Sequence, residues 1–188
     1  MLLEEVEKKE VKEIPKKIIG GLAWPEEGNP AFLVLVSEKR QSAEESLEPQ
    51  IDYLEIIKEL EGQTIQELVD QIEDDINILY VSKAAKYSTY IRDLGQWKRN
   101  EMEYIQIKPA ANSSFESGIM KIKDFIKGNK IRFPEKSKVK EQLKIFSDLS
   151  YKTPSSFYAV VALSNAICSI RERNIETSEQ EHNIKDWY

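Results

Sequence analysis

Residues 77–134 read NILYVSKAAKYSTYIRDLGQWKRNEMEYIQIKPAANSSFESGIMKIKDFIKGNKIRFP. Two short apolar runs in this stretch, NILYVSK (77–83) and EYIQIKPA (103–110), have the length of buried parallel strands. The run STYIRDLGQWKRN (88–100) lies between them and is predicted to be a helix, and SSFESGIMKIKDFIK (113–127) forms a second helix that ends at Gly128-Asn129. Because strand-helix-strand crossovers join parallel strands, this order predicts a parallel section of sheet.

The segments before this stretch predict antiparallel strands. KKIIGGLAWP (16–25) and GNPAFLVLVSEKR (28–40) are apolar, β-branched runs separated by proline and glycine, which is typical of a hairpin. IDYLEIIKELEG (51–62) fits either a third strand or the start of a helix, and its periodicity leaves both open. Thr64, with Glu67 three residues later, forms a capping box that predicts the start of a helix.

The last third of the chain is predicted to be mostly helical. KIRFP (130–134) is a short strand, and EKSKVKEQLKIFSDLSY (135–151) is an amphipathic helix. TPSSFYAVVALSNAICSIRER (153–173) is an almost wholly apolar helix that we expect to lie against the sheet, with Pro154 in its first turn. With 188 residues, 40% of them hydrophobic, the chain can bury one core. We therefore divide it into a mobile charged arm (1–16), one domain (17–173) and a polar tail (174–188).

The overall composition excludes several classes of protein. The 27 Lys and Arg nearly balance the 33 Asp and Glu, so a uniformly basic nucleic-acid coat is excluded. No run is long and apolar enough for a membrane helix and the N-terminus is too acidic for a secretory signal, so we expect a cytoplasmic protein without a membrane partner. Cys168 and His182 are the only residues of their kinds, which argues against a disulfide or a Cys/His metal site.

The element order resembles a known fold and, within it, a known family. Two antiparallel strands, a third element, a helix and then alternating strands and helices form the order of the ribonuclease H-like fold. FESGIMKIKDFIKGNKIRFPEKSKVKEQLKIF (115–146) is similar to a helix, a G-x-[basic]-[apolar]-x-[FI]-P strand and the next helix in the C-terminal nuclease domain of the viral terminase large subunit. PSSFYAVVALSNAI (154–167) resembles the closing helix of that domain. The resemblance covers residues 17–173 and implies an α/β fold, with a mixed sheet whose first strands are antiparallel and whose later strands are parallel, and with helices on both faces.

The resemblance also implies a two-metal nuclease site, whose ligands this sequence lacks. In the family, carboxylates at the ends of two strands and on the last helix hold two divalent ions. Here Leu22 stands at the first position, Val81, Ser82 or Lys83 at the second, and Ser155–Val161 contains no acidic residue. We therefore expect an inactive nuclease domain without a metal cofactor. A displaced site for Mg²⁺ or Mn²⁺, and with it a metal-dependent DNA endonuclease, is the alternative that would use nearby carboxylates: Glu26, Glu27, Glu38, Asp93 and Asp148.

Positive charge is concentrated in the middle of the chain. Such a concentration can hold a phosphate backbone, so we expect binding to double-stranded DNA, although Lys-rich helix surfaces also occur on many soluble proteins. The resemblance implies a packaging or processing assembly of a virus or provirus inside the host cell. No GxxxxGK[ST] phosphate loop occurs, so an ATPase motor or other viral subunit would be a separate chain. The candidate DNA-binding residues are Lys83, Lys86, Lys98, Arg99, Lys121, Lys123, Lys127, Lys130 and Arg132, with Arg92, Lys136, Lys138, Lys140 and Lys144 close by in sequence.

A protein-interaction module or structural subunit without a nucleic-acid role is the other class of function. Trp24 stands at a strand-end turn where an indole can anchor a partner, although core packing is the more common place for such a residue. Trp187 and Tyr188 are two large aromatic residues in the polar tail, where we expect them to dock onto the domain or a neighbouring subunit.

Overall fold

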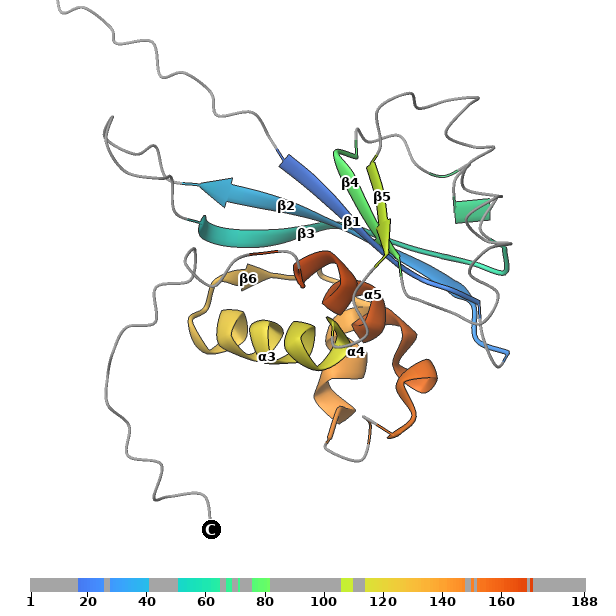
Figure 1. Cartoon of the computed structure of the whole chain (residues 1–188). Helices are drawn as coiled ribbons and strands as arrows, with labels where there is room; N and C mark the ends of the chain where they lie inside the picture. Colours follow the sequence, from blue (N-terminus) through green and yellow to red (C-terminus); the bar gives the residue numbers. More distant parts are fainter. Residues whose placement is uncertain are drawn as a thin grey trace, which may run out of the picture.

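The fold is seen in a computed structural model (Figure 1). For residues 106–109 and 114 only the backbone is described. The described residues are 17–25, 28–40, 51–64, 67–68, 71, 76–81, 106–109, 114–147, 150, 152–168 and 170.

A six-stranded mixed sheet with the order β5-β4-β1-β2-β3-β6 forms the centre of the molecule. The pairs β1–β2 and β2–β3 are antiparallel, whereas β1–β4, β4–β5 and β3–β6 are parallel. This is the ribonuclease H-like mixed sheet that the element order predicts, extended at the β3 edge by a short sixth strand. The strands are β1 (Lys17–Ala23), β2 (Ala31–Arg40), β3 (Ile51–Gly62), β4 (Ile78–Val81), β5 (Gln106–Pro109) and β6 (Ile131–Arg132).

The third element, which the sequence left open, is the longest strand of the sheet. β3 pairs with β2 from Ala31↔Gly62 to Arg40↔Ile51, with a shift in register between Leu35 and Val36. β6 adds to its outer edge, where the Leu54 amide donates to the Lys130 carbonyl at 2.8 Å. The short KIRFP strand therefore closes part of an otherwise open sheet edge.

Three α-helices cover one face of the sheet, namely α3 (Ser114–Lys127), α4 (Lys138–Ile145) and α5 (Tyr158–Ile167) (Figure 1). α3 ends as predicted, with Asn129 at a positive φ of 52° and the Lys130 amide donating to the Phe125 carbonyl. α4 is shorter than the sequence predicted and begins at Ser137, whose hydroxyl accepts from the Lys140 amide. The predicted last helix is divided into a 3₁₀ turn, Pro154–Phe157, followed by α5.

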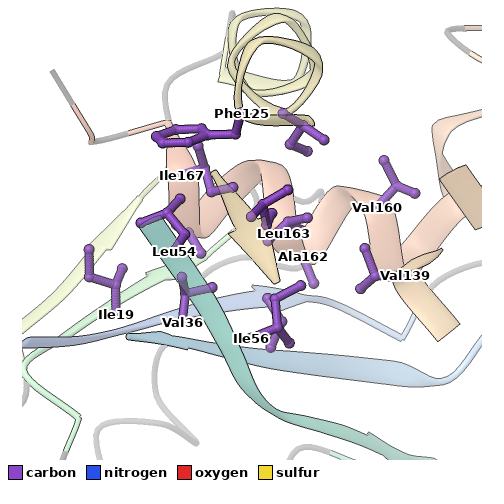
Figure 2. Close-up of a cluster of buried hydrophobic side chains, with 14 of the residues drawn as sticks. Ile19, Val36, Leu54, Ile56, Phe125, Val139, Val160, Ala162, Leu163 and Ile167 are labelled. Carbon is purple, nitrogen blue, oxygen red and sulfur yellow. The ribbon is translucent and has the colours of Figure 1, made fainter. Parts of the chain in front are cut away.

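The sheet separates two apolar cores. The first core lies between the sheet and the helices, and Figure 2 shows Ile19, Val36 and Leu54 of the strands beside Leu163 of α5 and Phe125 of α3. The second core lies on the opposite face and contains Leu22, Trp24, Leu33, Leu68 and Leu79 among others. Successive strand residues alternate between the two cores, which is why residues 18–23 of β1 and 31–36 of β2 carry no polar side chain.

On the second face, the described residues show only parts of the predicted helices. The Thr64 hydroxyl accepts from the Glu67 amide at 3.2 Å, as a helix cap there requires, and Leu68 is buried. The rest of this predicted helix lies mostly outside the described residues, as does all of the predicted helix 88–100. Residues 1–16 and 174–188 also lie outside them, so the predicted arm and tail stay predictions.

Candidate functional site

The carboxyl ends of β1 and β4 lie side by side, where the nuclease resemblance would require metal ligands. Leu22 pairs with Val81 in the parallel register, and both side chains are buried in the second core. Leu22 therefore points away from α5, and Ala23 is the residue that faces the helix at the end of β1. None of these three side chains can bind a metal.

The space between β1 and α5 is closed by tight packing. A Cβ atom on Gly21 would overlap the Ala162 carbonyl oxygen and lie 2.7 Å from the Ala166 amide. The buried Asn165 amide group donates to the Leu22 carbonyl at 3.0 Å. α5 therefore lies directly on the backbone of β1.

The first turn of α5 is satisfied by a neutral side chain. Gln142 of α4 is buried, and its Oε1 accepts from the Ala159 amide at 2.9 Å and from the Val160 amide at 3.3 Å. Aromatic rings surround this turn, with Phe157 packed edge-on against Phe146 at 5.1 Å between centroids. Tyr158 lies 5.6 Å from the ring of Phe32. In the resembled family an acidic pair occupies this part of the closing helix, whereas here the surroundings are an amide and aromatic rings.

Two carboxylates of β3 approach the helices from the same face of the sheet. Glu59 accepts from the Ser137 hydroxyl at 2.5 Å and from the Lys138 amide at 2.7 Å, so it caps the start of α4. Glu61 accepts from the Tyr158 hydroxyl at 3.3 Å. Burial of the ring, and then the Glu61 charge, raise the pKa of Tyr158 above its ordinary value of 10.0. Within the described ranges, no three His, Cys, Asp or Glu side chains come together as a metal site would require.

Glu38, proposed above for a displaced metal site, lies at the wrong end of the sheet. It pairs across β1–β2 with Lys17, whereas the carboxyl end of β1 is at Ala23, about 20 Å further along the strand. Its side chain is 2% exposed and binds Arg40 at 2.7 Å and Lys17 at 3.5 Å. Glu38 is therefore one partner in a buried ion pair, and the prediction for this residue is wrong. The other candidates, Glu26, Glu27, Asp93 and Asp148, lie outside the described residues, as do Ser82 and Lys83.

The lysines and arginines that were predicted to bind DNA have different environments. Lys121 donates from Nζ to the Cys168 carbonyl at 2.8 Å and to the Ile170 carbonyl at 2.7 Å. Its ammonium therefore stabilises the end of α5, and we assign it a structural role in place of the predicted contact with DNA. Burial raises the pKa of the Cys168 thiol, and the nearby Lys121 charge opposes part of that rise.

The outer surfaces of α3 and α4 carry exposed lysines. Lys123 and Lys127 are one turn apart on α3, on the side opposite its buried Ile122 and Phe125. Residues 114–147 contain nine Lys and Arg against four Asp and Glu, a net charge of +5, whereas the remainder of the chain carries −11. Within the described part of the chain, five exposed lysines of this segment have no ion pair: Lys123, Lys127, Lys136, Lys140 and Lys144.

Arg132, another predicted DNA contact, lies on the opposite face of the sheet from these lysines. Its guanidinium carbon is 3.6 Å from the centre of the Tyr53 ring. Lys130 is half-buried, with its side chain beside Gly128. The predicted contacts Lys83, Lys86, Lys98 and Arg99 lie outside the described residues.

Of the three aromatic residues proposed as partner anchors, the structure describes Trp24. Trp24 is 3% exposed and belongs to the second core. Of the two positions considered for Trp24, the structure shows the core position, so the indole is not exposed as a partner anchor. Trp187 and Tyr188 lie outside the described residues.

Several residues that organise this region were not predicted. Gln142, Glu59 and Glu61 act across long sequence separations, and nothing in their local sequence marks them as caps. Tyr53 was not singled out either, and the structure places it at a partly exposed position of β3.

Comparison of the chain with protein-family models, with curated proteins and with solved structures found no match. In the described part of the chain, none of the helices has the length and apolar character needed to cross a membrane.

Proposed function

We propose that this chain is a nuclease-like domain without nuclease activity that binds the backbone of double-stranded DNA. The terminase-like sequence of residues 115–146 supports a role in a viral DNA-packaging or processing assembly. In such an assembly the domain would act beside an ATP-driven motor, whose phosphate loop is not among these 188 residues.

The loss of catalysis is supported by the residues at the carboxyl ends of β1 and β4. Metal-dependent cleavage needs anionic oxygen ligands that converge on the ions. Leu22, Ala23 and Val81 offer none, and Gln142 occupies the first turn of α5 with a neutral amide. A protein of this kind incubated with Mg²⁺ or Mn²⁺ should leave plasmid DNA intact.

Cleavage that disappears in Glu26→Ala or Asp148→Ala would replace this proposal with a displaced-site nuclease. These two carboxylates are the appropriate test, because Glu38 is committed to Arg40 and Lys17.

The observation that carries the binding proposal is the set of unpaired lysines on α3 and α4. A lysine without a carboxylate partner keeps its full charge for a phosphate, whereas Lys138 is already 3.9 Å from Glu141. α3 and α4 lie on the same face of the sheet, so their outer surfaces are on one side of the molecule (Figure 1).

A salt titration of duplex binding tests the proposal. Affinity should be independent of sequence and fall with the logarithm of salt at a slope near −0.9 per neutralised phosphate, so that four contacts lose about a hundredfold for a fourfold rise in salt. Lys123→Glu and Lys127→Glu should each weaken binding and flatten the slope by about one.

Lys152→Glu is the matched control, because Lys152 is exposed, changes the net charge equally and lies outside residues 114–147. The control should leave the slope unchanged. Absence of duplex binding at about 50 mM salt, where electrostatic attraction is strong, would contradict the proposal.

A further inference from the structure

Arg132 and Tyr53 form an exposed stack at the β3–β6 edge of the sheet. Leu54 points into the first core, so its neighbours on β3, Tyr53 and Glu55, point to the opposite face. Arg132 is in register with Glu55 across the parallel β3–β6 pair, and its guanidinium carbon lies 3.6 Å from the centre of the Tyr53 ring. This contact is therefore on the face away from α3, α4 and α5.

Glu55, the carboxylate in register with Arg132, forms an ion pair with another cation. The Glu55 carboxylate binds Lys39 at 3.4 Å, and Lys39 lies opposite Tyr53 in the β2–β3 register. Within the described residues, Arg132 is exposed and has no ion pair. Its N–H groups are thus available to a ligand although a carboxylate lies beside it.

The stack holds the guanidinium in a position that suits a nucleotide. One plane of the group rests on the Tyr53 ring, which restricts an otherwise flexible side chain before any ligand arrives. Because Arg132 is exposed, a planar base could stack on the other plane of the guanidinium, and the in-plane N–H groups can donate to a phosphate. A duplex keeps its bases stacked on one another, so only an unpaired base can use this outer plane.

We propose that Arg132, supported by Tyr53, is a stacking site for an unpaired base of single-stranded nucleic acid. This inference rests on the proposed nucleic-acid binding but assigns a second strand type to a second face of the sheet. Duplex backbone would bind the lysines of α3 and α4, and a single strand would bind at the β3–β6 edge.

The test uses two labelled probes with the same phosphates, an oligothymidine of about ten nucleotides and an abasic strand of equal length. Arg132→Lys keeps the charge but removes the planar group, so it should weaken oligothymidine binding about tenfold and leave the abasic strand unchanged. Tyr53→Ala should have a similar effect, because the guanidinium loses its support. Lys152→Arg serves as the control and should change neither affinity.

Equal binding of oligothymidine by the wild-type protein and Arg132→Lys would overturn the inference, as would an equal loss with both probes. Thermal unfolding of Arg132→Lys should match the wild type, which separates lost stacking from lost folding, and Tyr53→Ala provides an independent route to the same loss.

Duplex binding measured in parallel separates this inference from the proposed function. Suppose that Lys127→Glu weakens duplex binding, while Arg132→Lys binds oligothymidine as tightly as the wild type. This result overturns the inference and leaves the proposed function standing. Weaker oligothymidine binding by Arg132→Lys, with no duplex binding by the wild-type protein, overturns the proposed function and leaves the inference standing. Failure to bind any of the probes at about 50 mM salt overturns both.

Discussion

The two ends of β1 differ in their surroundings: the amino end lies beside an ion-paired carboxylate, and the carboxyl end is packed against a helix whose first turn is capped by an uncharged side chain. At its amino end, Lys17 and the neighbouring strand bring together a buried carboxylate, Glu38, and two cations, with Arg40 at 2.7 Å. At its carboxyl end, Gly21 and Ala23 pack directly against α5, and two buried first-turn amides of that helix are satisfied by Gln142.

The difference shows what a buried carboxylate needs in this fold. Removing an anion from water is costly unless a cation and hydrogen bonds accompany it. Glu38 has such partners at the amino end, whereas a nuclease would supply metal ions at the carboxyl end. With no acidic ligand among the described residues at that end, close packing and a neutral amide are the stable arrangement, and the domain can keep its fold without the metal site.

The largest expected change in stability comes from the close packing of Gly21 against α5. Gly21→Ala should lower the free energy of unfolding by about 3 kcal/mol, because the new methyl group meets backbone atoms of α5 that cannot rotate away. Urea denaturation measures the loss. Gly20→Ala is the matched control on the other face of β1, where the methyl group would meet the Leu79 Cδ1 atom at 2.8 Å, which is free to rotate. Equal losses for the two variants would contradict the packing argument.

Breaking the ion pair at the amino end should have the second largest effect. Arg40→Met leaves Glu38 buried with only the half-exposed Lys17, and we expect a loss of about 2 kcal/mol in the free energy of unfolding. Lys39→Met removes a partly exposed partner of Glu55 from the adjacent position and should cost less than about 0.5 kcal/mol. Chemical denaturation of both variants would show whether burial decides the difference, and similar losses would show that it does not.

Removing the neutral cap of α5 should cost less. Gln142→Leu leaves the Ala159 and Val160 amides without their acceptor, and we expect a loss of about 1 kcal/mol in the free energy of unfolding. The exposed neighbour Glu141, changed to Leu, should lose less than about 0.5 kcal/mol. A Gln142→Leu variant as stable as the wild type would mean that another group satisfies these amides.

The fold was predictable from the sequence because its signals are local. Apolar runs bounded by proline and glycine marked β1 and β2, and Gly128-Asn129 marked the end of α3. Whether residues 51–62 form a strand or a helix was not predictable, because the burial of these residues depends on the pairing of β3 with β2 and β6.

The identities of residues at the strand ends could be read from the sequence, but their surroundings could not. The missing acidic residues at Leu22 and Val81 are visible in the sequence, but which core these side chains enter depends on strand alternation. The partners of Glu38 and Gln142, and the stack of Arg132 on Tyr53, arise from register and tertiary packing. The sequence allowed both an exposed and a buried Trp24 for the same reason, since a turn sequence does not reveal on which side its indole packs.

The smallest effect concerns Glu61, a carboxylate of β3 that contacts the start of α5. Its hydrogen bond comes from the neutral Tyr158 hydroxyl, and burial together with the Glu61 charge raises the pKa of that phenol above 10.0. In the unfolded chain the phenol ionises at its ordinary pKa, while in the folded protein it stays neutral to higher pH. Stability from this contact is therefore complete below about pH 10 and is lost as pH rises toward the folded-state pKa.

Tyr158→Phe should change the free energy of unfolding at neutral pH by less than about 0.5 kcal/mol, because the contact is exposed, and should reduce the alkaline loss of stability. Urea denaturation at neutral pH and above pH 10 measures both effects, and an absorbance titration of tyrosinate should lose one group that ionises above pH 10. Glu61→Gln is the companion variant, since it removes the charge but keeps an oxygen acceptor for the hydroxyl. It should lower the pKa of Tyr158 without abolishing the hydrogen bond, and an unchanged titration would show that burial alone raises this pKa.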